Sequence, residues 1–322
     1  MIDLFSKRYY FFAISIILLL AGFIGLLVNG VQLDIQFEGG TLIQIEMSDD
    51  KFDTNKVESE VSSALGKKVT AQKLQTYNAK DTTGKINLLM LKVSKENTLT
   101  GEELNKVVEL LKKDFNVKAD AQIQVQNVEP FMGEEMLRKG ILAAVIASVL
   151  IVIYVWWRFS VISGLSAAVF ANLALLHDAL VMFSLYAIFK LPLNDSFIAA
   201  VLTILGYSIN DTIVIYDRIR ENIRSTKKMP FAQLVNTSVI QTMARSINTT
   251  VTVLICVITV LIFATVNNIE SIKEFALPLL VGLLSGTYST IFIASPLWAM
   301  WQEAKAKRRA AAKAARPAKA SK

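Results

Sequence analysis

Cysteine and histidine are nearly absent from this chain, since its 322 residues include one of each, Cys256 and His177. A single cysteine cannot form a disulfide within the chain, and it excludes metal sites that need several cysteine ligands. A single histidine likewise excludes the zinc sites that are built from several histidines. We therefore expect neither an internal disulfide nor a metal site of these kinds.

Charge is also scarce, at 19% of residues, whereas 53% are hydrophobic, which is more than a soluble protein of this length carries. Most charges lie in two zones, residues 34–139 and the C-terminal end. Elsewhere lie apolar runs of about 20 residues, the length that crosses a bilayer as a helix. They are Tyr9–Val28, Ile141–Trp157, Val161–Phe189, Phe197–Tyr216, about Ser246–Val266 and about Phe275–Trp301. The sequence predicts an α-helical polytopic membrane protein with six transmembrane helices.

Basic residues in the short segments between spans predict the orientation, because cytoplasmic loops carry an excess of lysine and arginine. Six alternating spans put the basic segments on one side; these are Lys7 and Arg8, Arg158, the cluster Arg218–Lys228, and the tail. The opposite loops, Lys190–Asp195 and Asn267–Glu274, carry few basic residues. We expect both termini in the cytoplasm and the segment between the first two spans outside it.

The two ends of the chain have simple interpretations. The first apolar run is long enough to span and lacks a small-x-small cleavage site, so we expect a retained anchor rather than a signal peptide. The tail after Ala304 is rich in alanine, lysine and arginine and accounts for much of the net charge of +7. A solvated tail near anionic lipid headgroups explains that composition, and we expect no nucleic acid partner.

Residues 31–137 are water-soluble in composition and read as strand, helix, strand, strand, helix, strand. The alternating stretch from Leu33 to Met47, interrupted by Gly39 and Gly40, predicts a strand with a bulge. Two helices are expected at 53–65 and 100–115, and three further strands at 69–75, 85–93 and 117–128. This order is the ferredoxin-like pattern. With no histidine, cysteine or phosphate-binding glycine loop in it, a binding or mechanical role is expected.

The domain organisation follows from these boundaries. We expect the cytoplasmic N-terminus and first transmembrane helix at 1–30 and an extracytoplasmic ferredoxin-like domain at 31–137. A five-helix transmembrane bundle at 138–301 and a basic cytoplasmic tail at 302–322 complete the chain.

The most informative polar residues are Asn210 and Asp211, in the fourth apolar run. Insertion of an aspartate at the centre of a membrane helix costs roughly 2.5–3.5 kcal/mol. One interpretation is a satisfied carboxylate that only locks helix packing. The other is a proton carrier, because burial favours the protonated form of a carboxyl and a nearby cation favours the ionised form.

Arg245 is the candidate cation. In an antiparallel hairpin of the fourth and fifth spans, residues equidistant from the turn lie at equal depth, and Lys228 in the turn is midway between Asp211 and Arg245. An amphipathic surface helix at Phe231–Met243 would change this register. Arg245 could also be an interfacial residue that reaches toward water.

Three further polar residues have structural and functional interpretations that the residues alone leave open. His177 and Asp178 interrupt the third span, either as a core polar pair or as members of the same relay as Asp211. Asp217 lies among arginines near the cytoplasmic end of its span, where a network of helix-end charges explains it. It points about 120° away from Asp211 around the helix, so the two form no dyad.

Four motifs resemble the SecF family of the bacterial protein-export machinery, which is related to RND transporters. The stretch Gly206–Asn222 resembles its fourth-span signature, Phe37–Thr41 its Gly-Gly-Thr motif, and Pro130–Glu135 its motif before the second span. The His177–Asp178 pair also fits. Gln36 and Glu129 depart from the family pattern, and both lie outside the membrane spans.

The resemblance implies a function and partners. SecF proteins pair obligately with SecD, each supplying half of an RND-type membrane unit that assists the SecYEG channel and the SecA motor, with YajC as a further partner. The proton motive force would drive movements that pull or release an unfolded translocating polypeptide. By motif position, Asp211 and Arg245 match the residues implicated in proton conduction, with His177, Asp178, Asn210 and Asp217 as relay or support.

The resemblance also implies that the chain is no enzyme, has no cofactor and lies in the bacterial cytoplasmic membrane. Sodium stays open as the coupling ion, since a carboxylate can also bind Na⁺.

Three other functions fit less well. An RND-type proton-coupled exporter of small solutes or lipids would usually hold two six-span repeats, and this chain has one. An intramembrane aspartyl protease using Asp178 and Asp211 would need a Gly-x-Gly-Asp signature, but Ser-Ile-Asn precedes Asp211. A membrane-anchored binding module would leave the polar residues within the spans unexplained.

Overall fold

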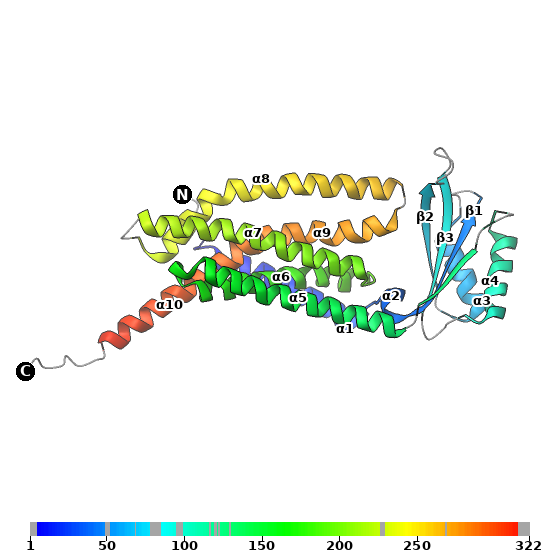
Figure 1. Cartoon of the computed structure of the whole chain (residues 1–322), viewed down its shortest axis with the longest axis horizontal. Helices are drawn as coiled ribbons and strands as arrows, with labels where there is room; N and C mark the ends of the chain where they lie inside the picture. The colour runs from blue at the N-terminus through cyan, green and yellow to red at the C-terminus, as the bar shows by residue number, and fades with distance from the viewer. Residues whose placement is uncertain are drawn as a thin grey trace, which may run out of the picture.

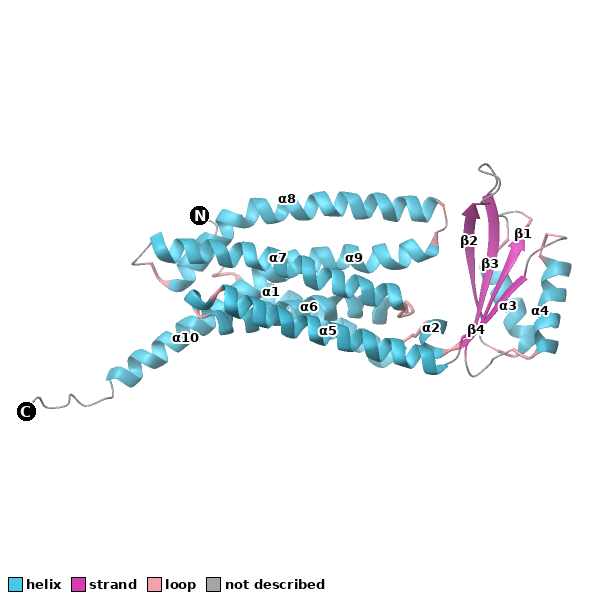
Figure 2. Cartoon of the chain, in the orientation of Figure 1, coloured by secondary structure: helices cyan, strands magenta, loops and turns pink. Residues whose placement is uncertain are grey.

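The computed structural model consists of a long helical bundle with a small sheet domain at one end (Figures 1 and 2). It describes residues 5–48, 52–67, 69–77, 85–94, 99–115, 117–118, 121, 123–128, 130–225, 229–267 and 269–314. Six of its helices are long and apolar enough to cross a membrane. The predicted helical membrane fold with six spans is confirmed, and the chain is a multi-pass membrane protein.

The spans follow the apolar runs, and most of their helices extend beyond them. The bundle consists of α1 (Arg8–Asn29), α5 (Pro130–Arg158), α6 (Gly164–Phe189), α7 (Asp195–Ser225), α8 (Phe231–Val266) and the last span. The last span is α9 (Glu270–Ser289), a π-helical turn (Thr290–Ala294) and α10 (Ser295–Ala314) in succession. A π-helical turn inside a helix frequently marks a functional site.

Burial divides the helices into inner and outer ones. Apolar residues such as Ile17, Trp157 and Ile262 on α1, α5 and α8 are more than half exposed, as expected for side chains that face lipid. By contrast, α6 and α7 bury most of one side each, and α9 packs against both. A Cβ atom at Gly282 of α9 would lie 2.4 Å from the Ile204 side chain on α7, so glycine permits this close approach. The most closely packed part of the bundle therefore lies where α6, α7 and α9 meet.

The structure of the fifth span decides between the two alternatives for residues 231–243, a separate surface helix or the start of the span itself. Residues 231–243 are not a separate surface helix, because α8 runs without a break from Phe231 to Val266. The hairpin of α7 and α8 therefore keeps the equal-depth register expected for Asp211 and Arg245. The start of α1 and the end of α7, both expected on the cytoplasmic side, lie at the end of the bundle opposite the sheet. Helix α10 leaves the bundle at the same end (Figure 1).

The small domain has the predicted ferredoxin-like order. Its elements are β1 (Gly40–Met47), α3 (Thr54–Leu65), β2 (Val69–Tyr77), β3 (Lys85–Ser94), α4 (Gly101–Asp114) and β4 (Ile123–Val128). The strands form an antiparallel sheet in the order β2-β3-β1-β4. Asp53 caps α3, and Thr100 with Glu103 forms a capping box on α4. Both helices cover the sheet face that points away from the bundle (Figure 2).

Two strand predictions in this domain are wrong. Residues Ile35–Glu38 form the one-turn helix α2 rather than a strand, and β1 begins only at Gly40. Gly40 has φ +145°, and a Cβ atom there would lie 2.1 Å from the Val93 carbonyl oxygen, so the glycine starts the strand instead of forming a bulge within it. The last strand begins at Ile123, and Val117 contributes only an isolated bridge to Met47.

Candidate functional site

Helix α7 carries buried polar side chains on two of its faces. Ser208, Asp211 and Thr212 are each at most 9% exposed, within a helix that is otherwise packed by apolar residues. Ser208 bonds Asp178 of α6 and Thr212 bonds Thr290 of the last span, whereas Asp211, about 60° away from Ser208 around the helix, bonds Ser246 of α8. The same helix therefore contributes to two polar sites, one facing α6 and α9 and one facing α8.

The first site surrounds Asp178 of α6, which is fully buried. Its carboxylate accepts hydrogen bonds from Ser208 Oγ of α7 at 2.8 Å, Ser285 Oγ of α9 at 2.7 Å and Ser289 Oγ at 2.8 Å. The two α9 serines are spaced i,i+4, so they lie on one face of that helix. Since one carboxylate joins three helices through hydroxyl groups, this site binds the centre of the bundle together.

His177 adds to this site from the neighbouring position on α6. Its Nδ1 lies 3.3 Å from Asp178 Oδ1, and its ring stacks against Tyr288 with 6.3 Å between centroids. The other ring nitrogen, Nε2, is buried and has no hydrogen-bond partner among the described residues. The side chains of His177 and Asp178, which are adjacent in the sequence, therefore also contact one another in the structure.

The second site surrounds Asp211. Its Oδ1 accepts a short hydrogen bond from Ser246 Oγ of α8, while Oδ2 is buried and has no partner among the described residues. Buried polar groups are nearly always hydrogen-bonded, so an orphaned carboxylate oxygen indicates a proton, an ion or a water as its missing partner. Asp211 is thus incompletely satisfied by the protein, in contrast to Asp178.

A small cavity of about 90 Å³ opens beside Asp211 between α7 and α8. Tyr207, Asn210 and Val214 line it from α7, and Arg245 and Thr249 line it from α8. Arg245 shares the cavity with Asp211, but no ion pair joins the two in the described part of the chain. The predicted depth is therefore observed, and the residue that touches Asp211 is Ser246, one position further along. Asn210 lies at the same cavity, on the exposed side of α7.

Asp217 is not part of either site. It lies near the end of α7 and pairs with Arg158 of α5 at 3.1 Å and with Arg220 at 2.8 Å. Glu221 similarly pairs with Arg218 at 2.8 Å. The helix-end charge network anticipated from the sequence explains these contacts, and it ties the end of α5 to α7.

Within the described residues, no side-chain hydrogen bond connects the partners of Asp178 to those of Asp211. The four serines at positions 208, 246, 285 and 289 were not recognised from the sequence. A partial signal existed, because Ser285 and Ser289 lie at i,i+4 in an apolar run. Serines are common in membrane helices, however, and only their convergence on a carboxylate distinguishes them.

Comparison with known proteins gives a consistent picture. A family model described as protein export membrane protein SecD/SecF, C-terminal, matches residues 107–304. The SecF subunit of Alicyclobacillus acidocaldarius is 34% identical over 304 residues, covering 93% of this chain and 92% of that protein. SecF of Anaerolinea thermophila is 34% identical over 308 residues, or 94% of both chains.

Longer relatives contain the match as one part. The SecDF protein of Bacillus subtilis is 38% identical over 303 residues, which are 93% of this chain and 38% of that protein. The crystal structure of SecDF from Thermus thermophilus superimposes with a TM-score of 0.75 at 28% identity, over 94% of this chain and 39% of that one. A SecDF structure in a super-membrane-facing form gives a TM-score of 0.70 at 27% identity, with 96% and 40% coverage. The chain thus spans about two fifths of the SecDF proteins it matches.

Proposed function

This chain belongs to the SecD/SecF family of protein-export membrane proteins, and on that basis we propose that it is a SecF-type subunit driven by an ion gradient. Membership supports a role in Sec protein translocation as an accessory subunit rather than as an enzyme. The single observation that carries the ion-coupled part is the buried, unpartnered Oδ2 of Asp211 beside a polar cavity.

A SecD protein is the partner of this chain. The Bacillus and Thermus relatives hold SecD and SecF in one polypeptide, and this chain corresponds to about two fifths of each. The Thermus protein is described as translocon-associated, which supports action of this chain beside a translocon. We propose that this translocon is a SecYEG channel with its SecA motor, with YajC as a further partner. The substrate would be an unfolded polypeptide on its way through the membrane.

The membrane face beside Asp211 supports the need for a partner. Asn210 on α7 and Arg245, Asn248 and Thr249 on α8 are exposed, although their helices cross the membrane. Polar side chains in membrane helices almost always face protein or a water-filled cavity rather than lipid. Transmembrane helices of SecD would cover this face and complete the cavity around Asp211.

The positions of the basic residues support the orientation. The bundle end opposite the sheet carries the basic ends of helices, namely Arg8, Arg158, Arg218, Arg220 and Arg224, and the start of the basic stretch in α10. By the positive-inside rule this end lies in the cytoplasm of a bacterial cell, and the sheet domain lies outside. The domain would then hold and release the emerging chain.

Asp211 would carry the coupling ion in this scheme. Its free oxygen can take up a proton when the cavity is open to one side and release it when the arrangement around Arg245 changes. The Ser246 hydroxyl, which now donates to Oδ1, would hold the carboxyl in place during both steps. The scheme involves no catalysis and no resident cofactor.

The test uses membrane vesicles that contain the full chain, its SecD partner and the Sec channel. Asp211→Asn keeps the size of the side chain and removes its charge, so we expect normal assembly but loss of both proton entry and potential-driven export. Glu221→Gln is the matched control, because Glu221 lies on the same helix in the exposed charge network. Normal potential-driven export in the Asp211→Asn variant would overturn the proposal.

The identity of the coupling ion is tested by imposing a proton gradient and a sodium gradient separately. With a proton gradient alone we expect export of a reporter protein late in translocation, and with a sodium gradient alone we expect none. If only a sodium gradient drives export, Asp211 remains the proposed carrier and the coupling ion is Na⁺ instead of H⁺.

A further inference from the structure

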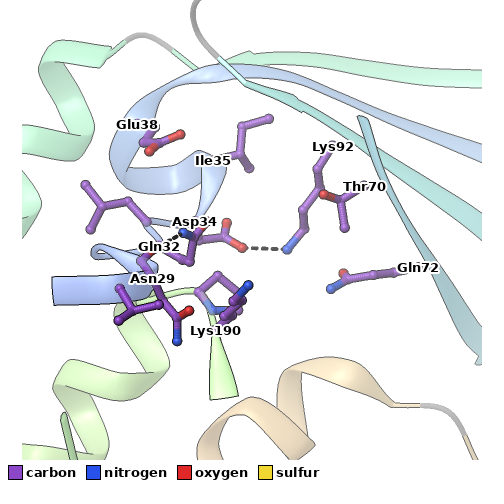
Figure 3. Close-up of a pocket in the computed structure, with 12 residues that line it drawn as sticks. Asn29, Gln32, Asp34, Ile35, Glu38, Thr70, Gln72, Lys92 and Lys190 are labelled. Atoms are coloured by element: carbon purple, nitrogen blue, oxygen red, sulfur yellow. Dashed lines mark hydrogen bonds and ion pairs between the residues drawn. The ribbon is translucent and has the colours of Figure 1, made fainter. Parts of the chain in front are cut away.

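A buried ion pair joins the sheet domain to the segment through which it is attached to the bundle. Lys92 Nζ of β3 lies 2.6 Å from Asp34 Oδ2, and the Asp34 side chain is only 3% exposed. Figure 3 shows the two side chains pointing toward one another, one from the segment after α1 and one from the sheet. The pair lies at the wall of a cavity of about 490 Å³ that Gln72, Glu38 and Lys190 also line.

The attachment segment is itself bonded to the loop between α6 and α7. The Asp34 backbone N–H donates to the Leu193 carbonyl at 2.9 Å, and the Leu193 N–H donates to the Gln32 carbonyl at 2.8 Å. These two bonds form a short parallel bridge between residues 160 positions apart, Leu33 and Leu193. Asp34 thus connects the sheet to the loop, because its side chain pairs with Lys92 and its backbone bonds Leu193.

The loop continues into α7 and is hydrogen-bonded to α9. The Phe197 N–H of α7 donates to Asn194 Oδ1 at 3.0 Å, and Asn194 Nδ2 donates to Glu274 Oε2 of α9 at 2.6 Å. The Tyr186 hydroxyl of α6 donates to the Glu274 carbonyl at 3.3 Å. Helix α7 carries Asp211, and α9 carries the serines of the Asp178 site.

Such a connection is suited to transmitting force. A buried ion pair contributes little net stability, because desolvation offsets most of the attraction, but it holds two surfaces in one relative position. The adjoining cavity leaves space into which the sheet can move when that position changes. An axial shift of α7 would pull on Asn194 and Leu193, then on Asp34, and through Lys92 on the sheet.

We infer that Asp34 and Lys92, with the loop residues Leu193 and Asn194, form a strut that couples helix α7 to the position of the extracytoplasmic sheet. These are positioning residues, since none of them lines the cavity beside Asp211. The inference rests on the proposed function, because it names the route by which the event at Asp211 would reach the domain. Asp211 loads the ion, and the strut converts the change in α7 into movement of the sheet.

The experiment separates ion movement from export in the vesicles that contain SecD and the Sec channel. Lys92→Met removes the charge and keeps much of the side-chain volume. We expect proton entry at the wild-type rate and a loss of potential-driven export of at least about fivefold, the lower range of coupling between distant sites. Lys92→Arg retains the charge and should retain export.

The matched control is Lys118→Met. Lys118 forms an ion pair with Glu46 in the same domain, at a half-exposed position away from the strut. Wild-type export in Lys92→Met, or equal loss in Lys118→Met, would overturn the inference. Loss of proton entry in Lys92→Met would also overturn it, because the pair would then act on the membrane site itself.

A second variant covers the case in which Lys92→Met fails to assemble with SecD. Leu193→Pro removes the N–H that donates to the Gln32 carbonyl and changes no charge. The expected result is again proton entry without export, and normal export in this variant overturns the strut. Intact proton entry in Asp211→Asn would instead contradict the proposed function, so the two failures are distinguishable.

Discussion

The two buried carboxylates of the bundle, Asp178 and Asp211, differ in how completely the protein satisfies them. Asp178 is fully buried and accepts from three serines, with His177 beside it. Asp211 is 9% exposed, accepts from one serine and keeps an oxygen without a partner in the described residues, next to a cavity. Both are aspartates at membrane depth, and for each the residues alone left a structural and a functional interpretation open.

The difference assigns the two residues different roles. A carboxylate with a complete set of donors gains nothing from binding an ion, and its hydrogen bonds are lost if it moves. A carboxylate with a free oxygen beside a cavity has room for a transferable partner. We therefore propose the Asp178 site as the structural centre of α6, α7 and α9, and Asp211 as the residue available for coupling.

The strongest test of this contrast is Asp178→Ala. Hydrogen bonds between membrane helices contribute about 0.6 kcal/mol each on average and up to about 1.7. Loss of the shared acceptor for several donors should therefore lower the free energy of unfolding by on the order of 2–4 kcal/mol. Denaturation of the purified protein in mixed micelles measures this change.

Two companion variants calibrate that result. Ser285→Ala removes one donor and should lower the free energy of unfolding by about 0.6 kcal/mol, and Asp211→Asn should change it by less than Asp178→Ala does. A larger destabilisation from Asp211→Asn than from Asp178→Ala would reverse the roles assigned to the two carboxylates.

Arg245→Met tests the Asp211 site, because Arg245 lines the cavity beside Asp211. Arg245 is exposed and makes no ion pair with Asp211 in the described chain, so the free energy of unfolding should change by less than about 0.5 kcal/mol. Potential-driven export should nevertheless fall by about tenfold, since a nearby cation commonly changes proton binding to a carboxyl by that factor or more. Reporter export in vesicles measures it, with Arg245→Lys as the charge-conserving control. Wild-type export in Arg245→Met would limit the coupling site to Asp211 and Ser246.

The smallest effect concerns a carboxylate in water, Glu103 of the sheet domain. Hydrogen bonds from Lys67 at 2.8 Å and from the Thr100 backbone N–H lower the pKa of Glu103 to about 2. Because the folded-state pKa is lowered, its stabilising contribution is present above about pH 4.5 and is lost as the pH falls toward 2.

Glu103→Gln should therefore lower the melting temperature of the full chain's sheet domain slightly at pH 7 and leave it unchanged near pH 2. Circular dichroism in detergent at the two pH values measures the difference. An equal shift at both values would show that the capping geometry of Thr100, and not the charge of Glu103, stabilises α4.

Much of the fold follows from local pattern, and the errors have physical causes. Apolar runs predicted the spans, and the order of strands and helices predicted for residues 31–137 matches the elements of the sheet domain. The stretch Leu33–Phe37 alternates like a strand, but the attachment of Asp34 to Leu193 and Lys92 folds Ile35–Glu38 into a turn of helix instead. Contacts with residues far along the chain overrode the local pattern there.

The sequence by itself determined which segments cross the membrane, the order of the sheet domain and the depth of Asp211, because hydrophobic length and periodicity are local properties. Tertiary structure decided the partner of each carboxylate. Asp178 meets Ser289 across 111 residues and Asp211 meets Ser246 rather than Arg245, since the rotation of each helix about its axis is set by packing against its neighbours. The strut from Lys92 to α7 exists only in the folded chain for the same reason.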